Sequence, residues 1–128
     1  MVMLVAVSWG ELLDKHTILE LKSARIKDPQ KLVHVRREAE VLWPALERAL
    51  GAHPGLAAVL AELKAVNGAL WEVEDEIREC ERRQAFGPRF IELARSIYRQ
   101  NDHRALLKRR INELMDSELV EQKSYRPY

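Results

Sequence analysis

The sequence predicts an all-α protein, built as a long antiparallel helical hairpin with one or two further helices packed on it. We expect a four-helix, bundle-like arrangement that forms a single domain over residues 1–128. Leu, Ala, Glu and Arg dominate the composition, and their side chains lose little rotamer freedom in a helix. Only five glycines and five prolines interrupt the chain. Apolar residues recur three or four positions apart on both sides of Phe86-Gly87, which is the spacing of one helix face.

The chain begins with the apolar run MVMLVAV, followed by a helix-start signal. We expect residues 1–8 to form an extended arm or an edge strand that covers the bundle. Ser8 and Glu11 have the spacing of a capping box, in which each side chain binds the backbone of the other. This signal predicts a helix over 9–27.

A second helix follows directly. Asp28 can cap it, and Pro29 fits its first turn, where the missing backbone N–H has no cost. The apolar spacing then continues over 29–50, although Pro44 falls inside it. A proline in a helix interior removes one hydrogen bond and crowds the preceding turn, so we expect a kink or a break there.

The second half of the chain predicts the hairpin, with long helices over 54–84 and 88–116 and a polar tail over 117–128 that packs only locally. A helix of about 30 residues is about 45 Å long. A compact domain of this size has a radius of gyration near 14 Å, so the hairpin should be elongated. Helix faces left uncovered would favour a homodimer with coiled-coil-like packing.

Charge supports this pairing of the last two helices. The segment EVEDEIRECE is acidic and RSIYRQNDHRALLKRR is basic, and a turn at Phe86-Gly87 would bring them side by side. Each exposed ion pair contributes only about 0.3–0.5 kcal/mol, so charge would bias the pairing of the helices.

Composition also limits the classes of function. The formal net charge is +1, so no overall field attracts nucleic acid or an anionic membrane, and we expect neither as a partner. The single cysteine, Cys80, allows no intrachain disulfide and favours a reducing, cytoplasmic location. The histidines lack metal-ligand spacing, and no nucleophile, phosphate-binding or dinucleotide motif is present. The sequence therefore indicates no metal, cofactor or catalytic residue and favours a non-enzymatic role.

The most informative pattern is a set of polar residues on helix faces that should be apolar. Such groups must pair, reach water or bind something, because burying an unpaired charge costs several kcal/mol. We expect those of the last two helices to face inward, and Asn67 to lie opposite Arg104. The candidate ligand-binding residues are Lys15, Lys22, Asn67, Glu74, Asn101, Arg104 and Lys108.

Three functions fit this pattern. The first is a protein–protein interaction or dimerisation module, in which the polar residues fix helix register. The second is a protein or enzyme that binds a small anionic ligand in a polar site within the bundle, gripped by the cationic groups. The third is RNA binding through the basic last helix.

The strings GELLDKHTILELKSARI, LWEVEDEIRECE, YRQNDHRALLKRRIN and EQKSY together resemble a bacterial family of domains of unknown function. The resemblance runs from Gly10 to Tyr125. It implies a bacterial source and a small helical domain, but no activity, cofactor or catalytic residue. Among the residues that match the family pattern are Asp14, Lys15, Lys22, Asn67, Glu74, Asn101, Arg104 and Lys108.

Overall fold

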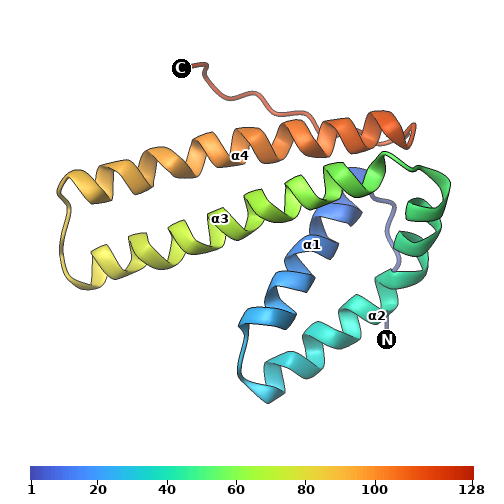
Figure 1. Cartoon of the computed structure of the whole chain (residues 1–128), viewed down its shortest axis with the longest axis horizontal. Helices are drawn as coiled ribbons and strands as arrows, with labels where there is room; N and C mark the ends of the chain where they lie inside the picture. Colours follow the sequence, from blue (N-terminus) through green and yellow to red (C-terminus); the bar gives the residue numbers. More distant parts are fainter.

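A computed structural model describes all of residues 1–128 and contains four helices and no strand (Figure 1). They are α1 (Trp9–Arg25), α2 (Pro29–Ala52), α3 (Leu56–Arg82) and α4 (Pro88–Leu114). Helices α3 and α4 form a long antiparallel hairpin, and α1 and α2 form a second hairpin that packs across one end of it (Figure 1). The all-α, four-helix prediction is therefore confirmed.

The first two helices begin where the cap residues predict. The Ser8 hydroxyl accepts a hydrogen bond from the Glu11 backbone N–H at 3.1 Å, and the Asp28 carboxylate accepts one from Gln30 at 2.9 Å. The predicted capping box is only half formed. The Glu11 carboxylate does not return to Ser8, because it forms an ion pair with Lys108 of α4.

Helix α2 continues through Pro44, so the proline bends the helix and does not break it (Figure 1). The helix is anchored on both sides of the bend. Val35 is buried before the proline, and Leu46 and Ala49 are buried after it. Packing on both flanks holds the two halves in helical conformation despite the lost backbone hydrogen bond.

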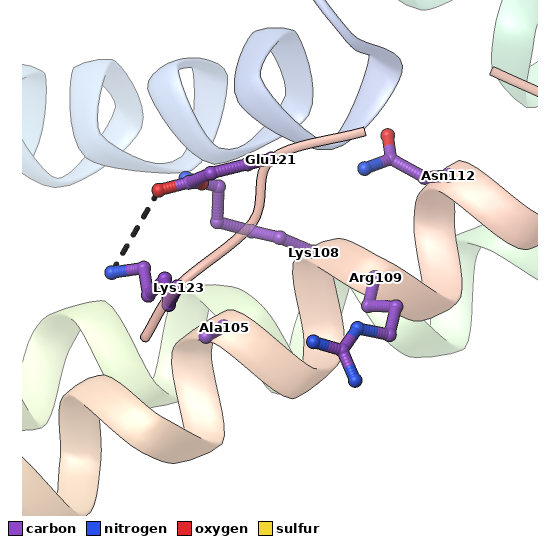
Figure 2. Close-up of a pocket in the computed structure, with 6 residues that line it drawn as sticks. All are labelled: Ala105, Lys108, Arg109, Asn112, Glu121 and Lys123. Atoms are coloured by element: carbon purple, nitrogen blue, oxygen red, sulfur yellow. Dashed lines mark hydrogen bonds and ion pairs between the residues drawn. The ribbon is translucent and has the colours of Figure 1, made fainter. Parts of the chain in front are cut away.

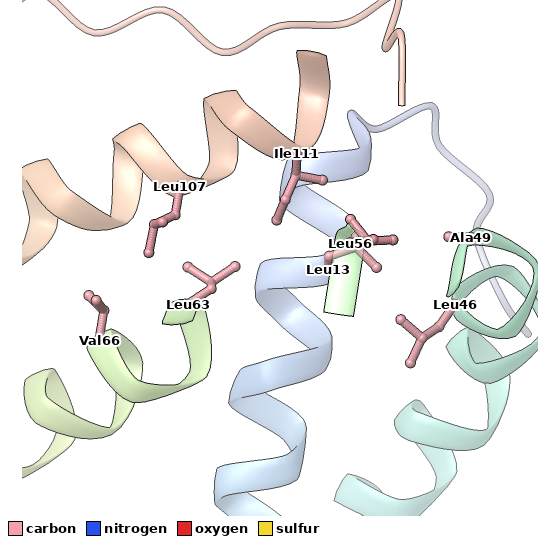
Figure 3. Close-up of a cluster of buried hydrophobic side chains, with 8 residues drawn as sticks. All are labelled: Leu13, Leu46, Ala49, Leu56, Leu63, Val66, Leu107 and Ile111. Atoms are coloured by element: carbon pink, nitrogen blue, oxygen red, sulfur yellow. The ribbon is translucent and has the colours of Figure 1, made fainter. Parts of the chain in front are cut away.

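The main hydrophobic core lies at one end of the hairpin, where α1 and α3 begin and α2 and α4 end (Figure 3). All four helices contribute to it. Its eight buried members are Leu13, Leu46, Ala49, Leu56, Leu63, Val66, Leu107 and Ile111. Figure 3 shows Leu63 and Val66 of α3 pointing toward Leu107 of α4.

The other end of the hairpin has no second layer. The last residue of α1, Arg25, forms an ion pair with Glu72 at 3.7 Å, and no hydrogen bond or ion pair joins α1 or α2 to a residue further along α3. We call residues 73–98, with the turn that joins α3 to α4, the distal hairpin. Leu93 is its one fully buried large side chain. The whole chain exposes 9225 Å², about 30% more than the roughly 7,000 Å² of a compact protein of 14.9 kDa.

Both ends of the chain lie outside the helices. Residues 1–7 have no regular secondary structure and are exposed, so they form an extended arm and not an edge strand. The C-terminal tail was expected to pack only locally, and this prediction is wrong. The tail returns along α4, where Glu121 pairs with Lys108 and the Tyr128 hydroxyl donates a hydrogen bond to Asp102 at 2.6 Å. None of the four helices has a stretch long and apolar enough to cross a lipid bilayer.

Candidate functional site

A buried polar network joins α1, α3 and α4, and Asp14 of α1 is its centre. One carboxylate oxygen, Oδ1, accepts hydrogen bonds from Asn67 Nδ2 and Arg104 Nε, both at 2.9 Å. The other, Oδ2, accepts from Arg104 Nη2 at 2.5 Å. Asn67 also donates to the Thr17 hydroxyl at 2.8 Å, and Thr17 donates to the Asp14 carbonyl. Asn67 and Arg104 thus lie opposite each other, as predicted, and both hold the same carboxylate.

A second polar cluster lies one helical turn away, around Lys108. Its ammonium group donates to Glu11 of α1 and to Glu121 of the tail, each at 2.9 Å. One turn further along α4, the Asn112 side-chain oxygen accepts from the Gly10 backbone N–H at 2.7 Å. The two helices cross so closely here that a Cβ atom on Gly10 would lie 2.6 Å from the Lys108 carbonyl oxygen. This close approach lets α1 contact α4 through its backbone.

The electrostatic state of both clusters follows from these contacts. Hydrogen bonds to Asp14 raise the pKa of Arg104, despite the opposing effect of burial. Burial alone would lower the pKa of Lys108, but its hydrogen bonds to Glu121 and Glu11 outweigh that effect and raise it. The same ion pair lowers the pKa of Glu121. Both buried cations are therefore charged at neutral pH and already have carboxylate partners.

The space beside Lys108 is too small for a ligand (Figure 2). The cavity there has a volume of about 30 Å³, and its lining residues are Ala105, Lys108, Arg109, Asn112, Glu121 and Lys123. A water molecule requires about 10–15 Å³ on this measure, so the cavity has room for two or three waters. The geometry around Asp14 and Lys108 is that of a closed network that fixes how the helices pack.

The structure brings together three of the seven candidate residues, namely Asn67, Arg104 and Lys108, on the side of the hairpin that faces α1. Lys15 and Lys22 of α1 lie outside this group. Lys15 is exposed and pairs with Glu38 of α2 at 3.4 Å, whereas Lys22 is half-buried and has no ion pair.

The expectation that Glu74 and Asn101 face a buried interior is not met. Glu74 is exposed and pairs with Arg78 on its own helix at 3.3 Å. Asn101 is half-buried, makes no side-chain hydrogen bond, and lies beneath the C-terminal tail. Glu74 follows Asn67 by two helical turns and so lies on the same face. However, α1 has already left the hairpin at that point.

Sequence reasoning missed Asp14 as the centre of the network and named it only among the residues that match the family pattern. Its spacing from other residues of α1 could have indicated the role. Gly10, Leu13, Asp14, Thr17 and Leu21 are all buried and lie three or four residues apart. An aspartate on such a face and an arginine on another predicted core face, here Arg104, are candidates for a buried ion pair.

The predicted pairing of an acidic with a basic helix half is also largely wrong. Glu74 and Glu79 pair with arginines of α3 itself, and an ion pair between Glu76 and Arg89 joins the two helices near the turn. The register explains the difference. Asn67 lies opposite Arg104 and Glu62 pairs with Arg110, so most of the basic run faces residues that precede the acidic segment.

No cluster of three His, Cys, Asp or Glu side chains is arranged to hold a metal ion. The fold and the network define the class of the protein as an all-α helical hairpin crossed by a second hairpin, with a buried carboxylate at their junction. The chain belongs to the family of unknown function DUF6165, whose model matches residues 3–127. No curated protein and no solved structure matches it.

Proposed function

We propose that the protein is a helical interaction module that associates with a second copy of itself through the distal hairpin. The observation that supports this function best is the lack of a second layer of helices over residues 73–98. A two-helix hairpin can bury only the line of side chains between its helices, and Leu93 is the one buried large side chain there. A second hairpin packed on this end would complete a four-helix bundle.

The face that a second copy would cover can be located from the positions of its residues on α4. Phe90 and Ala94 lie five helical turns before Lys108 and Asn112, the residues that contact α1. They therefore share the side of the hairpin against which α1 packs, beyond the point where α1 ends. Both apolar residues are half-buried. The exposed apolar face continues the one that α1 covers.

Charge makes this face suitable for a second copy. In the distal hairpin, α3 carries five acidic and two basic side chains between residues 73 and 82. Residues 88–99 of α4 carry three basic and one acidic side chain. In a dimer with two-fold symmetry, the acidic helix of each copy can lie against the basic helix of the other.

The area available is also sufficient. A stable interface buries about 800 Å² on each partner. The chain exposes roughly 2,000 Å² more surface than a compact protein of the same mass. This excess is larger than the roughly 800 Å² that each partner of a stable interface buries. Part of this surface belongs to the exposed arm of residues 1–7 and to the C-terminal tail, and the elongated hairpin contributes the rest.

The test is the molar mass in solution, measured by light scattering across a range of concentrations. We expect a value that rises with concentration toward twice 14.9 kDa. Ala94→Glu should keep the protein monomeric, because it places a further negative charge on the shared face. The matched control is Ala65→Glu, which makes the same substitution at an exposed alanine of α3 outside the distal hairpin, and this variant should still dimerise.

A monomeric mass at every concentration would overturn the proposal. So would equal loss of association in both variants, because that result would show that the contact between copies does not depend on the distal hairpin. Circular dichroism of each variant confirms that the helices remain folded, so a change in mass reports on association alone.

A further inference from the structure

The C-terminal tail forms an arch over the outer side of α4, and the space beneath it is much larger than the cavity beside Lys108. The tail is held at two points, by the Glu121–Lys108 ion pair and by the Tyr128–Asp102 hydrogen bond. Between them lies a cleft of about 1080 Å³, comparable in size to large ligand sites. It is lined by twelve residues of α4 and the tail, half of them hydrophobic.

The cleft carries positive charge that has no partner within the protein. Arg109 of α4 and Arg126 of the tail both line it, and neither forms an ion pair. Lys123 adds a third cation, which lies 3.8 Å from a Glu121 carboxylate that Lys108 also binds. Asp102 is the one acidic residue of the lining, and its carboxylate already accepts a hydrogen bond from the Tyr128 hydroxyl. This contrasts with Asp14 and Lys108, whose charges are fully matched.

The rest of the lining offers flat apolar surfaces. The rings of Tyr98 and Tyr128 pack edge to face with their centres 5.0 Å apart, at the end of the cleft near the C-terminus. The Tyr125 ring lies under the Lys123 ammonium group at 5.7 Å. Aromatic faces of this kind stack on planar rings, and guanidinium groups bind carboxylate or phosphate oxygens in pairs of hydrogen bonds.

From this juxtaposition we infer that the cleft beneath the tail binds a small organic anion, with one phosphate or carboxylate group attached to a flat ring. Arg109 and Arg126, on opposite walls, hold the charged group. The tyrosine rings contact the flat part, and Asn101 supplies a directional hydrogen bond. The site lies on the outer side of α4, so it is separate from the face proposed for association.

The experiment titrates the full chain with four matched probes and follows the backbone amide signals of residues 98–109 and 123–128 by NMR. The probes are 1-naphthyl phosphate, 1-naphthoate, 1-naphthol and inorganic phosphate. We expect the two aromatic anions to shift these signals, and the neutral ring and the bare phosphate to bind at least tenfold more weakly. Whichever aromatic anion binds more tightly identifies the charged group.

Two variants and one control test the residues. Arg109→Gln and Arg126→Gln should each weaken binding by about tenfold, since each removes one charge-assisted contact. Arg95→Gln removes an exposed, unpaired arginine of α4 outside the cleft and should leave binding unchanged. The inference is overturned if neither aromatic anion binds, if inorganic phosphate binds equally well, or if the control weakens binding as much as the two variants.

Discussion

Asp14 is the one acidic side chain in the interior of the protein, and its carboxylate connects three helices by accepting three hydrogen bonds. An aspartate in an apolar environment is costly unless its oxygens are paired. Here Arg104 binds both oxygens and Asn67 binds one, so the pairing is complete. The three helices satisfy this carboxylate in the register that places Asn67 of α3 and Arg104 of α4 beside Asp14 of α1.

Replacing Asp14 by Asn should therefore destabilise the protein by about 2–3 kcal/mol, because it leaves the Arg104 guanidinium half-buried without a counter-charge. Urea unfolding followed by circular dichroism measures the loss. Glu79→Gln, which breaks an exposed pair on α3, is the control and should leave the midpoint essentially unchanged. A negligible effect of Asp14→Asn would contradict the central role of this residue.

The Glu121–Lys108 pair makes docking of the tail dependent on pH. The pKa of Glu121 lies below its ordinary value of 4.5, so its contribution is complete above pH 4.5 and is lost as the pH falls through the lowered pKa. The pKa of Lys108 lies above its ordinary 10.5, so its contribution is complete below that pH and is lost as the pH rises through the raised pKa.

NMR signals of residues 119–125 should report release of the tail at both limits, while the helices stay folded. In Glu121→Gln the acidic step should disappear, because the titrating carboxylate is gone. Tail signals that remain in their docked positions well below pH 4 would show that this ion pair does not hold the tail.

At the scale of the helices, the crossing of α1 over α4 depends on a residue without a side chain. Gly10→Ala places a methyl group 2.6 Å from the Lys108 carbonyl oxygen, so α1 must move away from α4. We expect a loss of about 1–3 kcal/mol despite the better helix propensity of alanine. The thermal unfolding midpoint measures it.

Gly51 provides the matched control. It lies inside α2, and a Cβ atom there would meet nothing within 4 Å. Gly51→Ala should therefore stabilise the protein by about 0.5–1 kcal/mol through helix propensity alone. Opposite signs for the two glycines would confirm that close packing, and not backbone flexibility, determines the role of Gly10. Equal effects would contradict it.

The helices themselves could be predicted because their signals are local. Ser8, Asp28 and Pro88 mark starts that the structure places within one residue. The position of Asn67 opposite Arg104 was also predictable, since a tight turn near Phe86 fixes which residues lie opposite each other. The exposure of Glu74 was not, because it depends on the angle at which α1 leaves the hairpin. That angle results from contacts between distant residues, such as Gly10 with Asn112.

At the scale of the whole molecule, the core occupies one end and the distal hairpin extends from it (Figure 1). Stability should differ accordingly along α3 and α4. Hydrogen exchange followed by mass spectrometry should show the slowest exchange near the core residues Leu63, Leu107 and Ile111. In the monomer, residues 73–98 should exchange faster, since few apolar contacts hold them.

Raising the protein concentration should then slow exchange in residues 73–98 and leave the rest unchanged, because association would bury that segment. The Ala94→Glu variant is the control, and its exchange should not depend on concentration. Uniform slowing along the chain, or slowing confined to α2, would place the contact between copies elsewhere.

The separation of the core from the distal hairpin has a consequence for how the length of this protein can vary. Removing seven residues from each helix near the turn takes out two turns and keeps the remaining side chains close to their original orientation. No contact of Asp14, Lys108 or Gly10 lies in the removed part. The length of the hairpin can therefore change without any change to the junction that supports it.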